Sequence, residues 1–171
     1  MVAHVTLDFD PIAEAAGNWH RKDWPAVDAM TAATSITRAH QILVGRIDAA
    51  LAPLGLNFSR FEVLALLDLS REGQLPLGKI GDRLQVHPAS VTNTIDRLER
   101  DGLVRRERHP ADGRTRLGVI TAVGRRSANA GAAALGEIEF GLEGMGVAAR
   151  NRTVESIREL RAAAGDYDDA E

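Results

Sequence analysis

Residues 77–120 read LGKIGDRLQVHPASVTNTIDRLERDGLVRRERHPADGRTRLGVI, and this stretch decides the fold. Apolar residues recur at helical spacing in two short segments, at Leu77, Ile80 and Leu84 and again at Val91, Ile95 and Leu98. Residues 85–87 are all that separates the two segments. Pro88 suits a first helical position, and Gly102 suits a left-handed cap after the last turn. The pattern predicts two short helices joined by a tight turn.

After Gly102 the apolar period changes to two. Residues 103–108 and 115–120 alternate on either side of residues 109–113, which contain the turn-forming pair Asp112-Gly113. This predicts a β-hairpin, and Thr121 then fits the N-cap of a following helix. Two short helices and a hairpin are the parts of a winged helix-turn-helix.

Longer helices are predicted on both sides of this unit. Residues 24–51 carry an apolar stripe at Ile36, His40, Leu43, Ile47 and Leu51. A helix over 59–69 is predicted to begin with Ser59 as N-cap and Glu62 in a capping box. Beyond Thr121 an Ala-rich helix is expected to break near residues 141–146, because each interior glycine costs about 1 kcal/mol relative to alanine. A last helix carries Val154, Ile157 and Leu160.

The predicted fold class is therefore mainly α (α+β), a winged helix-turn-helix flanked by N- and C-terminal helices. We expect an N-terminal arm and dimerisation helix over 1–57, the winged domain over 58–120, and C-terminal dimerisation helices over 121–171. The flanking apolar stripes are too large for the small central domain to cover alone. This pattern is consistent with burial of the stripes between subunits.

Composition excludes several classes of function. The 171-residue chain is 44% apolar and has no cysteine, which excludes disulfides, thiolate metal sites and thiol redox chemistry. No stretch approaches a membrane span of roughly 18 apolar residues, so we expect a cytoplasmic protein without membrane contact. Nucleophile-elbow, metalloprotease and phosphate-loop motifs are absent, and the His residues are scattered. We therefore expect no enzyme, no metal and no cofactor.

Positive charge is concentrated in the predicted winged domain. The whole chain has a net charge of −3, but residues 58–120 carry 11 Lys/Arg against 9 Asp/Glu, a net of +2, and the flanks carry 10 against 15. Residues 103–118 hold five Arg against two acids, a basic strip able to face phosphates. A solvated surface run is the alternative interpretation of this strip.

The exposed face of the second short helix is predicted to read double-stranded DNA in the major groove. Asn93 suits adenine, Arg97 suits guanine or phosphate, and small hydroxyl side chains suit either a base or a phosphate. At the hairpin tip, Asp112 is expected to hold Arg114 for a narrow minor groove, unless Asp112-Gly113 serves only the turn. The candidate DNA-binding residues are His87, Pro88, Ser90, Thr92, Asn93, Thr94, Arg97, Asp112 and Arg114.

The run from His87 to Arg106, followed by Asp112-Gly113-Arg114 and Ile120-Thr121-Ala122-Val123-Gly124-Arg125, resembles the MarR family of regulators. The resemblance extends over residues 28–162. It implies a homodimer on a pseudopalindromic operator, and repression relieved by a small, often anionic aromatic ligand.

The N-terminal extension resembles the urate-responsive branch of that family. The resemblance places Trp19, Glu62 and Arg106 at three ligand positions, while Thr94 stands where that branch has an Arg. His40 is a further candidate contact. Packing across the dimer is the alternative for Trp19, and packing in the core or at an interface is the alternative for His40. Another ligand, or none, stays open, as does a winged-helix protein-interaction module without DNA binding.

Overall fold

The computed structural model describes residues 6–168. Its helices are α1 (Pro11–Arg21), α2 (Val27–Leu51), α3 (Phe58–Asp68), α4 (Leu77–Leu84), α5 (Pro88–Arg100), α6 (Ala122–Glu137) and α7 (Val147–Ala163), with 3₁₀ turns at Ala52–Leu54 and Glu139–Gly141. Its strands are β1 (Gln74–Pro76), β2 (Val104–Arg108) and β3 (Arg116–Ile120). The mainly α class with a small sheet is confirmed. The division at 57/58 and 120/121 stays a prediction, and residues 1–5 and 169–171 of its outer parts lie outside the described range.

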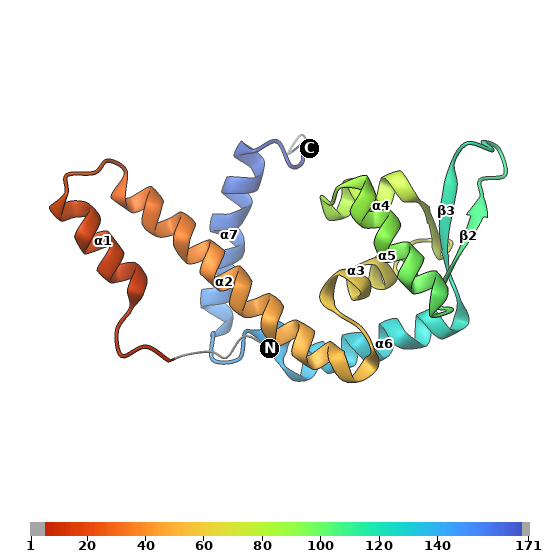
Figure 1. Cartoon of the computed structure of the whole chain (residues 1–171), viewed down its shortest axis with the longest axis horizontal. Coiled ribbons are helices and arrows are strands. Elements are labelled where there is room, and N and C mark those ends of the chain that lie inside the picture. The colour runs from red at the N-terminus through yellow and green to blue at the C-terminus, as the bar shows by residue number, and fades with distance from the viewer. Residues whose placement is uncertain (1–5, 169–171) are drawn as a thin grey trace.

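The sheet has the order β1-β3-β2, and both pairings are antiparallel. β2 and β3 form the predicted hairpin, in a register that runs from Val104 opposite Ile120 to Arg108 opposite Arg116. β1 adds a short third strand by pairing Gln74 with Val119. β3 therefore lies in the centre, and β2 is an edge strand. Figure 1 shows this hairpin as a wing that projects from the α4–α5 pair.

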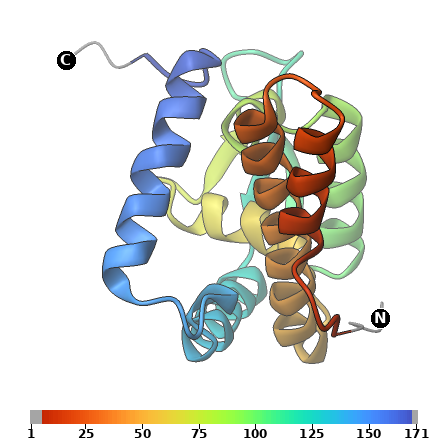
Figure 2. The same cartoon turned by 90° about the vertical axis from the view of Figure 1, so that its left-hand side faces the viewer.

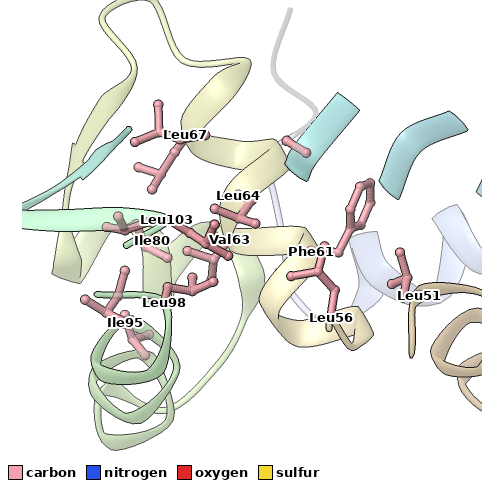
Figure 3. Packing of buried hydrophobic residues seen from close by; sticks show 14 of the residues in the cluster. Leu51, Leu56, Phe61, Val63, Leu64, Leu67, Ile80, Ile95, Leu98 and Leu103 are labelled. Carbon is pink, nitrogen blue, oxygen red and sulfur yellow. The ribbon is translucent and has the colours of Figure 1, made fainter. Parts of the chain in front are cut away.

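One hydrophobic core holds the winged domain together. α3 contributes Leu64 and Leu67, and the two short helices contribute Ile80, Ile95 and Leu98, all with no exposed surface. Figure 3 shows these side chains converging from α3, α4 and α5, with Phe61 and Leu51 continuing the core toward α2 and α6. Because these apolar faces are buried together, α5 is held with its opposite face in solvent.

The ends of α5 agree with the prediction, and the start of α3 does not. α5 begins at Pro88, and Gly102 has the left-handed φ of 70°. The predicted N-cap Ser59 is wrong. Asn57 caps α3 by accepting the N–H of Arg60, and the Asp48 carboxylate from α2 accepts the N–H of Phe58 at 2.7 Å. The helix thus begins one residue before Ser59, and Glu62 forms no capping box.

The glycines after Thr121 have two separate roles. Thr121 caps α6 by accepting the N–H of Gly124, as predicted. Gly131 lies inside α6 against Phe61, where an added Cβ would come within 2.7 Å of the ring. Close packing therefore compensates for this glycine. The predicted break is confirmed, since α6 ends at Glu137 and α7 begins at Val147, with Gly141 and Gly144 at positive φ between them.

The N- and C-terminal helices extend away from the winged domain (Figures 1 and 2). α1 folds back along the first half of α2, while α7 passes the middle of α2 in Figure 1 and stands apart from it in Figure 2. An apolar groove of about 750 Å³ runs between α2 and α7, lined by Ile36, Met145, Ile157 and Leu160 among others. Neither α1 nor α7 has a buried residue in the single chain.

Among residues 6–168, no single helix is long and apolar enough to cross a membrane. The helical segments Val27–Leu54 and Phe58–Asp68, which meet at a bend of 73°, are together long and apolar enough, by length and composition only.

Candidate nucleic-acid interface

The α5 helix presents a polar face because its apolar face is fixed in the core. Val91, Ile95 and Leu98 are buried, and by helical geometry Asn93 lies on the opposite side from all three. The His87 Nδ1 atom accepts the N–H of Ala89 and so caps the helix, which Pro88 begins. The start of the helix is thus rigid, as a base-reading element requires.

The structure brings most of the predicted α5 residues to the surface. His87, Pro88, Ser90, Asn93 and Arg97 are exposed. Thr94 is half-buried. Thr92 is exposed, but its hydroxyl donates to the Pro88 carbonyl at 3.1 Å, so that hydroxyl is already engaged in the helix.

A polar hollow of about 230 Å³ extends this face toward α3. Four predicted residues from α5 line it together with three residues that were not predicted to contact DNA: Ser90, Asn93, Thr94 and Arg97, with Asn57, Ser59 and Arg60. Arg60 is held there by an ion pair with Asp101 and by donating to the Gly55 carbonyl at 2.7 Å. That ion pair joins residues 41 positions apart. No local sequence pattern indicates it.

The wing tip is organised by Asp112. Its carboxylate accepts the Thr115 hydroxyl at 2.7 Å and the backbone N–H of Arg114 at 3.0 Å. These hydrogen bonds, first that of Thr115 and then that of Arg114, lower the pKa of Asp112. Asp112 thus holds Arg114 by its backbone N–H, and within residues 6–168 no hydrogen bond or ion pair joins the two side chains. Asp112 fixes the backbone of the turn, and the exposed guanidinium is left for an outside partner.

Arg106 on β2 ties the wing to the recognition helix. Its guanidinium pairs with Asp96 and with Glu99 at 3.2 Å, and it also donates to the Thr92 carbonyl at 3.2 Å. The Arg106 backbone N–H donates to the Glu99 carboxylate at 3.0 Å. The Arg106 side chain therefore connects the wing to α5, and we call this connection the Arg106 brace.

The arginines of this region fall into two sets. Arg60, Arg105 and Arg106 have carboxylate partners. Within the described residues, the exposed guanidinium groups of a second set have no ion-pair or hydrogen-bond partner: Arg97, Arg100, Arg108, Arg114 and Arg116. This second set lies on α5 and on the hairpin. Unpaired guanidinium groups on a recognition helix and a wing are the donors that phosphates and base edges accept.

The four predicted effector residues lie on four different elements. Trp19 on α1 donates to the Pro25 carbonyl at 2.9 Å and packs edge-to-face on Trp24, with ring centroids 4.7 Å apart. His40 is exposed on α2. Glu62 is half-buried on α3, where burial raises its pKa. Among residues 6–168, no hydrogen bond or ion pair joins any two of Trp19, His40, Glu62 and Arg106.

Comparison with known proteins identifies the chain's relatives. Residues 58–115 match the family model described as MarR family. Over 89 residues the chain is 33% identical to the HTH-type transcriptional regulator MhqR of Bacillus subtilis (strain 168). That alignment covers 52% of this chain and only 60% of MhqR.

Solved structures extend the similarity to the flanking helices. Sco5413, a MarR family transcriptional regulator from Streptomyces coelicolor, is 46% identical with a TM-score of 0.78, over 84% of this chain and 100% of that one. The regulator MOSR of M. tuberculosis, solved in complex with DNA, is 28% identical with a TM-score of 0.67, over 78% of this chain and 95% of that one. Because of the identity to Sco5413 and the coverage of both chains, we conclude that the chain belongs to the MarR family of transcriptional regulators.

Proposed function

We propose that this regulator represses transcription by binding a pseudopalindromic operator as a homodimer, and that a small anionic or aromatic effector releases it. DNA binding is supported above all by the exposed arginines on α5 and the hairpin that have no partner among the described residues: Arg97, Arg100, Arg108, Arg114 and Arg116. They sit on elements that a buried core and the Arg106 brace hold rigid.

Each part of the face suits one part of B-DNA. α5 fits the width of the major groove, with Asn93 and Arg97 toward the bases and His87, Pro88, Ser90, Thr92 and Thr94 along the helix. Arg114 extends from the wing toward an adjacent minor groove, where a narrow A·T-rich segment enhances the negative potential. Asp112 contributes by ordering the turn.

A homodimer is supported by the exposed apolar side chains of the outer helices. Val154 is 67% exposed and Leu160 is 55% exposed, both on α7, and Leu160 lines the groove with α2. A surface of this kind is costly in water and is covered by a second copy in a symmetric assembly. Two winged domains would then meet half-sites about one helical turn apart.

Effector release acts through the brace between wing and helix. Within residues 6–168, the acceptors of the Arg106 guanidinium all belong to α5: Asp96, Glu99 and the Thr92 carbonyl. An anionic ligand that competes for Arg106 would loosen the wing from the recognition helix. Trp19, His40 and Glu62 remain the proposed companions of Arg106, with Glu62 supplying a half-buried carboxyl.

The test is a fluorescence-anisotropy titration of the purified protein against DNA from upstream of its own gene, with non-specific competitor and at two salt concentrations. Tight, competitor-resistant and salt-dependent binding is expected. If neither this DNA nor a genome-wide site selection yields binding, the chain acts instead as a winged-helix protein-interaction module.

Asn93→Ala separates base reading from backbone contact. We expect the variant to lose roughly 1–3 kcal/mol of discrimination at one base position, with non-specific affinity nearly unchanged. An equal loss on every sequence would make Asn93 a phosphate contact instead. Affinities for operator variants and for random duplex DNA, measured in parallel, give the answer.

A further inference from the structure

The chain after α7 turns back and contacts the helix-turn-helix motif. Gly165 reverses its direction with a φ of 70°, and the Asp166 carboxylate accepts a hydrogen bond from the Gln85 side-chain amide. These residues are 81 positions apart. Figure 1 shows the C-terminal end of α7 facing the adjacent end of α4 across the space between the outer helices and the winged domain.

The tail is ordered by α7 before it meets Gln85. Arg161 Nε donates to the second carboxylate oxygen of Asp166 at 2.5 Å, and the Asp166 side chain is only 13% exposed. The Tyr167 hydroxyl accepts from Arg158 Nε at 3.0 Å. The guanidinium groups of Arg158 and Arg161 lie 5.7 Å and 5.3 Å from the Tyr167 ring centroid. Asp166 is therefore presented to Gln85 in one fixed position.

Gln85 is the hinge residue of the motif. It has a left-handed φ of 51°, ends α4, and is followed by only Val86 and His87 before the recognition helix begins. A contact at Gln85 thus constrains the start of α5. The contact between Gln85 and Asp166 joins the winged domain to the end of α7. The apolar face of α7 lines the proposed subunit interface.

We propose that Asp166 is a positioning residue that sets the angle of the winged domain on α7, and through it the half-site spacing that the dimer accepts. This rests on the proposed function, since spacing has meaning only for a dimer on two half-sites. When Gln85 contacts Asp166, each winged domain is held at one distance from the two-fold axis of the dimer. When the contact is absent, the winged domains move more freely, and the dimer tolerates other half-site spacings.

The experiment measures affinity for a series of operators in which the spacer between two constant half-sites is lengthened and shortened one base pair at a time. Wild-type protein is compared with Asp166→Ala. We expect the ratio of affinities between the best spacing and its neighbours to fall about tenfold (~1.4 kcal/mol), the contribution of one charge-assisted hydrogen bond. Binding to a single half-site should be unchanged.

A pair of substitutions keeps the test independent of folding defects. Gln85→Glu places two carboxylates together and should broaden the spacing profile as Asp166→Ala does. Adding Asp166→Asn puts an amide donor opposite Glu at position 85 and should restore the narrow profile. Ratios within the spacer series cancel any uniform effect of the added charge on affinity.

Glu159→Ala is the matched control, because it removes one exposed carboxylate from α7 without touching Gln85. It should keep the wild-type profile. A wild-type profile in Asp166→Ala, or a broad profile in the Glu159→Ala control, overturns the positioning role while DNA binding stands. Failure of the wild-type protein to bind any duplex in the series would overturn the proposed function instead.

Discussion

The winged domain and the outer helices bury their apolar residues very differently. Leu64 of α3 has no exposed surface, whereas Leu160 of α7 is 55% exposed. The winged domain closes a core within one chain, and α1 and α7 have no buried residue of their own. The same residue type therefore stabilises the fold in one region and is available for assembly in the other.

The difference shows which part of the molecule is complete alone. Reading DNA needs a rigid α5 and wing, and the single chain provides both through its core and the Arg106 brace. Pairing two winged domains needs a second copy, and we propose the groove between α2 and α7 as the surface that the second copy covers. Substitutions in the outer helices should therefore change the oligomeric state, whereas substitutions in the winged domain should change stability or DNA affinity.

Leu160→Glu should give the largest effect. A charge in the apolar groove opposes burial between subunits, so we expect monomers and an operator affinity lower by about 100- to 10,000-fold, the factor that bivalent binding supplies. Sedimentation velocity and anisotropy measure the two quantities. Glu155→Gln on the same helix should change neither. A Leu160→Glu dimer of normal affinity would place the interface elsewhere.

Leu64→Ala should instead lower the free energy of unfolding by about 2–5 kcal/mol, because it leaves a cavity in the closed core. Urea denaturation at a fixed protein concentration measures it, since dimer stability depends on concentration. Leu69→Ala is the matched control: Leu69 follows α3 directly and is 86% exposed, so a change within about 0.5 kcal/mol is expected. Equal losses in both variants would contradict the contrast between the regions.

Arg114→Ala should weaken operator binding by about ten- to a hundredfold and make its salt dependence shallower, while dimerisation and thermal stability stay normal. Arg114 is exposed and its guanidinium has no partner in the described chain, so the fold does not depend on it. Arg126→Ala removes the same charge from α6 and serves as the control. If both variants bind as the wild type does, the wing does not enter a groove.

Glu62→Gln, on α3 of the winged domain, should give the smallest effect. Burial raises the pKa of Glu62 above its ordinary 4.5, so the folded state favours the neutral carboxyl. That stabilisation is complete below pH 4.5 and is lost as the pH rises through the folded-state pKa. At pH 7 the variant should melt about 1–2 °C higher than the wild type, and the gain should vanish near pH 4.

Thermal melts of Glu62→Gln and Glu155→Gln across that range give the comparison. Glu155 is exposed on α7, so its variant should follow the wild type at every pH. A gain for Glu62→Gln that persists at acid pH would contradict burial of the charge as its cause.

Local signals were sufficient to predict the elements of the winged helix-turn-helix. Pro88 and Gly102 mark the ends of α5 because a proline ring and a left-handed glycine act within a single turn. The hairpin and the Thr121 cap followed for the same reason. The break before α7 was also visible, since several glycines within a few residues outweigh helix propensity.

What the sequence missed depends on contacts between distant residues. Asn57 and Ser59 are both good N-caps, and the α2 residue Asp48 decides between them by accepting the N–H of Phe58. Strand β1 is three residues long and contains Pro76, so only its pairing with β3 reveals it. The partners of Arg60 and Arg106 depend in the same way on how the helices pack.

The edge position of β2 has a consequence for behaviour at high concentration. Among the described residues its outer side has no partner strand, although the Arg106 N–H there already donates to Glu99, and an edge strand of this kind is a template for adding a strand from another copy. The side chains exposed along it are charged, Arg105, Glu107 and Arg108. Stacking two such strands in register would bring like charges together, so the wing that we propose to contact DNA also resists aggregation through its edge.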